Sequence, residues 1–236
     1  MANESNPHRV ALIPEFPSKH GGGRLGRHIH FDERSRNYRV AVEKVVKITT
    51  KTWTRTTKPF NQGNTGSCTG NGAAGVIATE PYKKPSVRYN EALARKIYSR
   101  ATKDDTIQGT WPPKDTGSTV LAAMKALKDL GYASGYTWCF GLDDVLKTLS
   151  MVGPVEVGVN WYEGFDRPNA KGLVKLAGQI RGGHAFELLG VDAENKLVIA
   201  ENSWGSSFGV GGRFFFSWKD LDRLLHEDGE ASTVKL

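Results

Sequence analysis

The chain has 236 residues and a formal net charge of +7, with 39% hydrophobic and 24% charged residues. This apolar content excludes a disordered chain, no apolar run approaches the roughly 20 residues of a membrane-spanning helix, and two cysteines are too few for a disulfide framework. The first residues contain no apolar stretch typical of a secretion signal. The composition therefore fits a soluble protein of a reducing compartment, without membrane association.

The basic excess lies in the first quarter of the chain. Residues 1–60 contain 12 Lys and Arg against 5 Asp and Glu, whereas residues 61–236 contain 20 of each. Residues 1–42 are rich in glycine and charge, which predicts a flexible basic arm. Nucleic acid is not expected as a partner, because basic and aromatic residues are not interleaved. Contact between the arm and an acidic partner stays open. His28 and His30 lack Cys or acidic neighbours at ligand spacing, so we expect no metal and no cofactor.

Apolar spacing predicts helices in the first part of the chain and strands in the second. Helices are expected over 70–78, 86–102 (with Ser86 as N-cap), 118–130 and 142–151, and strands over 155–159, 185–191, 197–202 and 213–218, before a closing helix over 217–225. This segregation favours an α+β fold. We assign a helical lobe to about 60–150 and a sheet lobe to about 151–225, within one domain spanning 43–236. A site is then expected between the two lobes.

Two cysteines occupy different sequence settings. Cys139 is flanked by Trp138 and Phe140, a setting typical of a buried, inert thiol. Cys68 lies where a turn-rich loop meets the helix of small residues. A helix N-terminus lowers the pKa of a thiol and offers N–H groups to an oxyanion, so we expect Cys68 to be the reactive thiol. Gln62 could supply a side-chain amide to the same oxyanion.

A thiol nucleophile needs a base, and the base needs an orienting partner. His184 opens the apolar strand over 185–191, whereas His226 stands in a polar stretch and is expected to be exposed. Asn202 ends the next strand, across a short turn, and could reach the His184 imidazole. Each residue alone is weak evidence. Together they form a candidate set of nucleophile, base, orienting residue and oxyanion donor.

Three sequence blocks around these residues resemble those of the papain-like cysteine peptidases. Residues 62–68 match the Q-G-x-x-G-S-C block, residues 183–185 match G-H-A, and residues 202–209 match N-S-W-G with its following glycine. The stretch 115–118, Asp-Thr-Gly-Ser, is a weaker fourth block that opens a helix in bacterial-type members. The order of the blocks and their approximate separations also agree with this family, over about residues 45–225.

The resemblance implies a two-lobed papain-like fold, with the nucleophile on a central helix packed against an antiparallel sheet. It implies that Cys68 is the nucleophile, His184 the general base and acid, and Asn202 its orienting residue. Gln62 and the Cys68 backbone N–H would form the oxyanion hole. The substrate-binding positions implied by the resemblance are Gly117, Ser118, Gly183 and Trp204, and Trp204 would also shield the His184–Asn202 contact from water.

The chain departs from the family pattern at several positions. Thr65 replaces a cysteine that forms a disulfide in secreted members, and Phe208 stands where a second tryptophan is usual. None of these departures removes a proposed catalytic residue. The absent disulfide and the Asp-Thr-Gly-Ser block resemble bacterial or phage members, which implies a cytoplasmic protein, located in the host cytoplasm if the chain is phage-encoded. The sequence therefore predicts a peptidase that hydrolyses peptide bonds in protein or peptide substrates through a thioester acyl-enzyme. Two alternatives remain: a catalytically silent papain-fold binding or structural protein, and a cell-wall peptide amidase, against which the N-S-W-G block speaks.

Overall fold

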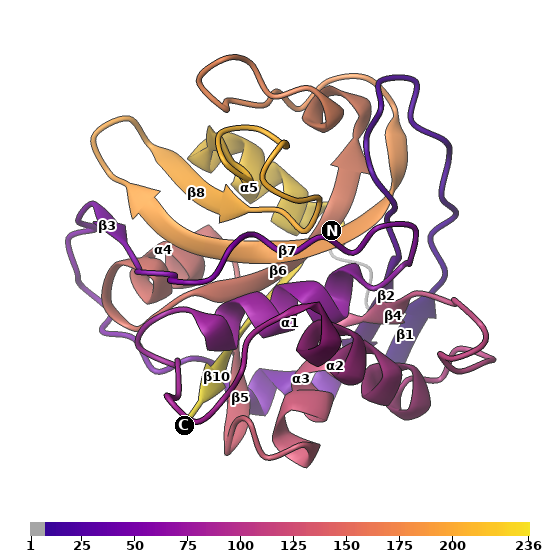
Figure 1. The fold of residues 1–236 in the computed structure, drawn as a ribbon. Helices are drawn as coiled ribbons and strands as arrows, with labels where there is room; N and C mark the ends of the chain where they lie inside the picture. Colours follow the sequence, from indigo (N-terminus) through magenta and orange to yellow (C-terminus); the bar gives the residue numbers. More distant parts are fainter. Residues whose placement is uncertain (1–7) are drawn as a thin grey trace.

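A computed structural model describes residues 8–236 and shows a long curved sheet with helices packed on both sides of it (Figure 1). The α-helices are α1 (Cys68–Ala78), α2 (Glu91–Asp104), α3 (Val120–Asp129), α4 (Leu142–Met151) and α5 (Trp218–His226). Two short 3-10 helices are η1 (Glu33–Tyr38) and η2 (Glu163–Asp166). This mixture of helices and antiparallel sheet confirms the α+β class.

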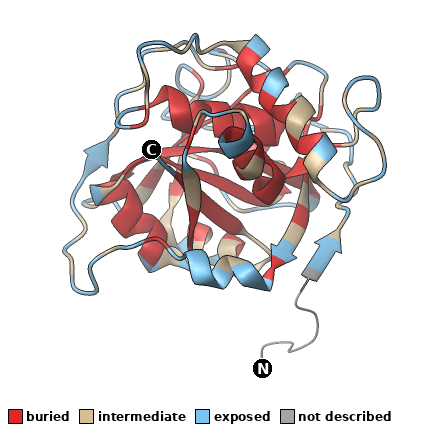
Figure 2. Ribbon diagram, turned by 90° about the horizontal axis from the view of Figure 1, so that it is seen from below, coloured by how far each residue is buried: buried red, intermediate tan, exposed pale blue. Residues whose placement is uncertain are grey.

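The helix α1 occupies the centre of the molecule. All 11 of its residues are buried, between α2 and α3 on one side and β7 on the other. Small side chains make this close approach feasible: a Cβ placed at Gly70 would lie 2.6 Å from the Cβ of Tyr98 on α2. The run of small residues is helical despite its low intrinsic helix propensity, because tertiary packing overrides propensity in a buried element. Figure 2 shows this buried interior beneath exposed loops.

The main sheet has the strand order β5-β10-β6-β7-β8-β9, and its pairs are antiparallel. Its strands are β5 (Gly135–Cys139), β6 (Val155–Tyr162), β7 (Ile180–Asp192), β8 (Leu197–Glu201), β9 (Arg213–Ser217) and β10 (Glu230–Lys235). The short strand β3 (Lys51–Thr52) pairs with β7 off this path. β7 is the longest element, and its position between β6 and β8 brings the middle of the strand against α1.

The described part of the N-terminal arm is packed on the domain, which corrects the expectation of an irregular segment. It contains β1 (His8–Ala11) and β2 (Arg27–Asp32), which form a small sheet with β4 (Ser118–Thr119). β2 pairs with β1 antiparallel and with β4 parallel. No local sequence signal indicated this packing, because the partners of the arm lie about 90 and 160 residues further along the chain.

Several predicted boundaries also change in the structure. α2 begins after Asn90, whose side chain accepts a hydrogen bond from Leu93 N, so the prediction of a Ser86 cap was wrong. β5 and β10 were not predicted, although they pair with each other across the chain. The other predicted helices and strands are present with shifts of a few residues, β7 being five residues longer at its start. Cys139 is buried on β5, as expected.

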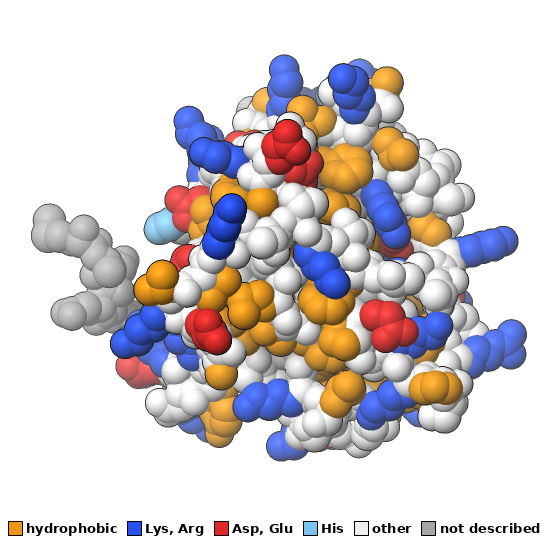
Figure 3. Space-filling model, turned by 90° about the vertical axis from the view of Figure 1, so that its left-hand side faces the viewer, with side chains coloured by type: hydrophobic (Ala, Val, Ile, Leu, Met, Phe, Trp, Pro, Cys, Tyr) orange, Lys and Arg blue, Asp and Glu red, His pale blue; other side chains and the backbone are white. Residues whose placement is uncertain are grey.

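The surface carries dispersed charge. Figure 3 shows Lys and Arg side chains scattered over one face among acidic and apolar groups. Within the described residues, no helix is long and apolar enough to cross a membrane.

Candidate active site

Cys68 is the first residue of α1, directly after the loop 61–67. Its side chain is fully buried and contacts the backbone N–H groups of Thr69 and Ala185. Ala185 lies on β7 next to His184, so the end of α1 and the middle of β7 meet at the thiol. The first N–H groups of a helix have no partner within the helix, which leaves them available around Cys68.

His184 and Asn202 are hydrogen-bonded. The imidazole Nε2 lies 2.8 Å from Asn202 Oδ1, and this oxygen also accepts from Ser203 N at 2.8 Å. Because Asn202 presents an oxygen, Nε2 carries the proton, which leaves Nδ1 as the unprotonated nitrogen of a neutral ring. Nδ1 is buried and has no hydrogen-bond partner among the described residues. The imidazole therefore holds a free basic nitrogen beside the strand that contacts the Cys68 thiol.

Burial keeps both groups uncharged in this structure. It raises the pKa of the Cys68 thiol to about 12, against the opposing effect of the Ala185 and Thr69 N–H groups. It also lowers the pKa of His184 to about 3, and the nearby charge of Arg181 acts in the same direction. The expectation that the helix N-terminus lowers the thiol pKa was wrong for this form, because desolvation outweighs the helix N–H groups. A thiol and a neutral imidazole are thus present, rather than an ion pair.

Gln62 lies in the loop before Cys68 and is fully buried. Its Nε2 donates to the Thr65 carbonyl oxygen at 2.7 Å, and its Oε1 accepts from Ser203 Oγ at 2.6 Å. Its backbone N–H donates to the Ser203 carbonyl oxygen at 2.9 Å. These bonds fix the amide group between the Cys68 loop and the segment that follows Asn202, with one N–H hydrogen of Nε2 left for a further acceptor.

Aromatic rings enclose the imidazole. The His184 ring centroid lies 5.1 Å from that of Trp204 and 4.8 Å from that of Trp161, which approaches it edge-on. Phe208 packs against Trp204 at 5.0 Å, so the residue that replaces the usual tryptophan still extends the cluster. Sequence reasoning missed Trp161, which is fully buried on β6. The β6–β7 register pairs Val159 with His184, and Trp161 lies two residues further along the same face of β6.

The N-terminal segment covers this site. Gly26 N donates to the Gly183 carbonyl oxygen at 3.1 Å, and the Gly26 carbonyl oxygen accepts from Ser118 N at 2.9 Å. A Cβ added at Gly117 or Gly183 would overlap the carbonyl oxygens of Gly26 and Arg27, respectively. Three of the four predicted substrate-binding positions are therefore occupied by the chain's own residues 26–27.

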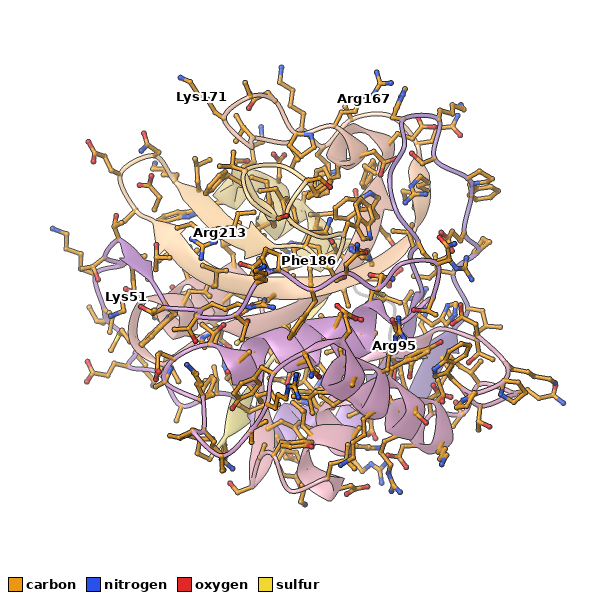
Figure 4. The ribbon with its side chains drawn as sticks, in the orientation of Figure 1. Lys51, Arg95, Arg167, Lys171, Phe186 and Arg213 are labelled. Carbon is orange, nitrogen blue, oxygen red and sulfur yellow. The ribbon has the colours of Figure 1, made fainter. Side chains whose placement is uncertain are left out.

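The fourth position, Trp204, also contacts the segment. Its Nε1 donates to the Arg24 carbonyl oxygen at 3.2 Å. Gly23, one residue before Arg24, is also held: its carbonyl oxygen accepts a hydrogen bond from Arg181 Nη2 at 2.6 Å. Arg181 in turn forms an ion pair with Asp166 at 3.2 Å. In Figure 4, Arg167 and Lys171 project outward from the loop beyond η2, whereas Phe186 lies inside the fold. Residues 23–27 thus cross directly over the candidate catalytic groups.

The loop that carries Gly66, two residues before Cys68, is held by residues to which the sequence assigned no role. Gly66 N donates to both carboxylate oxygens of Asp115, at 3.0 and 2.8 Å. Tyr98 Oη donates to Asp115 at 2.6 Å and accepts from Gly117 N at 2.9 Å. Asp115 belongs to the weak fourth sequence block, but Tyr98 on α2 carried no sequence signal. Together, Asp115 and Tyr98 connect the loop before Cys68 with the segment around Gly117.

Comparisons with known proteins show similarity to cysteine peptidases. No family model matches the chain. The cathepsin B-like CP2 of Giardia intestinalis is 31% identical over 115 residues, which cover 46% of this chain and 36% of that protein. Xylellain, a cysteine protease from Xylella fastidiosa, has a similar structure with a TM-score of 0.72 at 19% identity, covering 95% of this chain and 98% of xylellain. The chain is thus similar to papain-like cysteine peptidases in sequence over about half of its length and in fold over nearly all of it.

Two further proteins with cathepsin B in their names are also similar to this chain. The cathepsin B-like cysteine proteinase 4 of Caenorhabditis elegans is 28% identical over 53% of this chain and 42% of its own length. A procathepsin B from Trypanosoma congolense superposes with a TM-score of 0.65 at 12% identity, covering 93% of each chain. The chain matches less than half the length of these curated relatives. The structural likeness establishes the papain-like fold that the sequence blocks predicted.

Proposed function

We propose that this protein is a cysteine peptidase that hydrolyses peptide bonds in protein or peptide substrates. The observation that carries the proposal is the His184–Asn202 pair, because its hydrogen bond leaves Nδ1 as an unprotonated nitrogen one residue away from Ala185, whose N–H contacts the Cys68 thiol. An imidazole held by an amide oxygen at one nitrogen keeps the other nitrogen free to take a proton from a nucleophile.

The proposed reaction proceeds by acyl transfer. His184 Nδ1 takes the proton of the Cys68 thiol, and the sulfur attacks the substrate carbonyl carbon. The Cys68 backbone N–H and the Gln62 amide stabilise the resulting oxyanion. His184 then donates its proton to the leaving amine as the C–N bond breaks, which leaves a thioester. Water, deprotonated by His184, attacks the thioester and releases the carboxylic acid and the free thiol.

In this proposal, the described form is a covered, resting form of the enzyme. Residues 23–27 contact Trp204, Ser118 and Gly183, which are the positions a substrate would need. Displacement of the segment would admit water and substrate together. Hydration would lower the thiol pKa and raise the imidazole pKa, because burial is the main cause of both shifts.

The test is hydrolysis of an unfolded protein substrate by the full chain, compared with the variants Cys68→Ala and Cys139→Ala. Both cysteines are buried, so the two variants make similar demands on packing. We expect Cys139→Ala to retain turnover and Cys68→Ala to abolish it while the melting temperature is maintained. To keep the covering segment from masking the result, the same pair is repeated in the Arg27→Ala background. Turnover retained by Cys68→Ala in either background would refute the assignment.

A further inference from the structure

A buried arginine outside the catalytic set lies between the elements that carry the catalytic residues. The Arg55 side chain is only 3% exposed, although arginine is rarely buried without a counter-charge. Its Nη1 lies 2.8 Å from Glu187 Oε2 and 2.6 Å from Glu201 Oε1, and its Nε donates to Thr57 Oγ1 at 2.9 Å. Both carboxylates are buried as well. One guanidinium group therefore holds two acidic side chains in the interior of the domain.

The two carboxylates belong to residues that neighbour the proposed base and its orienting partner. Glu187 lies on β7, three residues after His184, and Glu201 is the last residue of β8, directly before Asn202. Glu187 and Glu201 are also paired with each other across the two strands. Like charges directly opposite each other in a sheet are destabilising. Arg55 thus joins β7 and β8 beside the His184–Asn202 hydrogen bond.

The same guanidinium group approaches the helix and the loop on either side of Cys68. A Cβ placed at Gly75 on α1 would lie 3.1 Å from Arg55 Nη1, so glycine lets the helix come close to the ion pair. Gly75 is seven residues after Cys68, which places the two on the same face of α1. The guanidinium carbon lies 4.4 Å from the ring centroid of Phe60, two residues before Gln62. Each candidate catalytic residue therefore lies on or beside a segment that contacts Arg55.

The charges in this cluster balance only when Arg55 is present. Glu201 has a second cation, Arg213 Nε at 3.4 Å, but Glu187 has no other cationic partner within residues 8–236. Burial raises the pKa of Glu187, the Arg55 charge opposes this effect, and the Glu201 charge adds to it. Without Arg55, two buried carboxyl groups would face each other across β7 and β8. Separation or hydration of the two strands would relieve this contact and displace the base and its partner.

We propose that Arg55 is a positioning residue that sets the place of the His184–Asn202 pair relative to Cys68, by holding α1, β7, β8 and the segment before Gln62 together. The proposal rests on the peptidase function above. Because a displacement of about 1 Å between reacting groups can lower a rate about a hundredfold, loss of this cluster should lower kcat by about ten- to a hundredfold. KM should change little, since none of the Arg55 contacts involves a substrate-binding position.

The kinetic test is made in the Arg27→Ala background, because Arg27 anchors the covering segment through hydrogen bonds to Glu230. Arg55→Met/Glu187→Gln removes one charge of each sign, which leaves Glu201 paired with Arg213 and favours folding. We expect the ten- to hundredfold loss of kcat in this variant. Arg55→Lys keeps the charge but loses the planar group, and should lower kcat at least about threefold. A kcat equal to that of the Arg27→Ala parent, in either variant, would overturn the proposal.

The control separates positioning from general destabilisation. Lys147 on α4 is also a buried cation, with a side chain 7% exposed. Its partners are Asp143 and the Lys44 carbonyl oxygen, at 2.7 and 2.6 Å, and neither adjoins a catalytic residue. We expect Lys147→Met to lower the melting temperature without changing kcat, when all variants are assayed well below their melting temperatures. An equal loss of kcat in Lys147→Met would overturn the proposal.

A spectroscopic test decides the matter even if no variant turns over peptide. In the chain labelled with nitrogen-15 at histidine, the His184 Nε2 proton, bonded to Asn202 Oδ1, should give a slowly exchanging NMR signal that Asn202→Ala abolishes. We expect this proton to exchange about tenfold faster in Arg55→Lys and at an unchanged rate in Lys147→Met. Equal exchange in Arg55→Lys and the unchanged chain would overturn the proposal. Faster exchange without any peptide turnover would instead support the positioning role and count against the peptidase function.

Discussion

Replacing Arg27 with alanine should uncover the Cys68 thiol without unfolding the domain. The substitution removes the hydrogen bonds to Glu230 and to the Asp228 carbonyl oxygen, and it leaves the Glu230 carboxylate buried without a cation. Removing one partner of a buried ion pair typically costs about 3–5 kcal/mol. The cost falls on the covered form alone, because Glu230 becomes hydrated when the segment leaves.

This energy sets the expected change in thiol accessibility. If Cys68 reacts only when the segment is displaced, its labelling rate follows the displaced fraction. A loss of about 3–5 kcal/mol corresponds to roughly a 150- to 5,000-fold larger displaced fraction. The assay is the rate of iodoacetamide addition at neutral pH, followed by intact mass and assigned to each cysteine by digestion.

Two controls separate displacement of the segment from general unfolding. Cys139 is also buried, with its pKa raised to about 12, but lies on β5 away from the segment's contacts with Gly183 and Ser118. It should remain unlabelled in Arg27→Ala. Arg34→Ala removes another arginine of the same arm, one with a largely exposed side chain, and should leave both labelling rates unchanged. An Arg27→Ala chain that labels Cys68 as slowly as the unchanged protein would refute the reasoning.

Three further predictions address the groups around the site. Burial lowers the pKa of His28, whose ring bonds to the Thr116 carbonyl oxygen, so below about pH 6.5 the covered form binds fewer protons than the open form and acid should displace residues 12–30. Hydrogen exchange of residues 12–30 should therefore rise at pH 5 in the unchanged protein but not in His28→Gln. Equal pH responses of the two proteins would contradict this prediction. Tyr98→Phe should destabilise the domain by about 1–3 kcal/mol in urea unfolding, because Asp115 and Gly117 N each lose a partner; an unchanged midpoint would contradict it. Asn202→Ala should lower kcat by about 10²–10⁴ with little change in KM, since the base loses its orienting bond, and a change in KM alone would contradict that role.

Local sequence patterns predicted much of the domain. The apolar stripe over 118–130 and the alternation over 155–159 correspond to α3 and β6, because each pattern reflects burial of one face or of a whole strand. The small residues of α1 were recognised from their position after the Cys68 loop. The central strand β7 was found but its start was not, because Gly182 and Gly183 read as loop residues although their lack of side chains admits the covering segment.

The long-range features escaped prediction for a common reason. Strand β10 pairs with β5 about 95 residues away, and β2 pairs with β4 about 90 residues away. Pairing over such distances produces no local sequence pattern from which it could be predicted. The four candidate catalytic residues were proposed from their chemistry and sequence blocks. In the structure, Gln62 and Cys68 lie at one loop–helix junction, and His184 is hydrogen-bonded to Asn202 next to Ala185, whose N–H contacts the Cys68 thiol. Arg27, Glu230 and Tyr98 could not be assigned from sequence, because a charged or phenolic residue usually indicates surface until its buried partner is known.

The central claim is that Cys68 is a nucleophile activated by His184. The most direct measurement is intact-mass labelling of the Arg27→Ala chain with a peptidyl epoxide, followed by mapping of the modified residue. The account predicts rapid addition of one inhibitor molecule at Cys68, none at Cys139, and loss of the reaction in Arg27→Ala/His184→Ala. Addition at Cys68 that is equally fast without His184, or no addition in a chain whose Cys68 reacts readily with iodoacetamide, would contradict it.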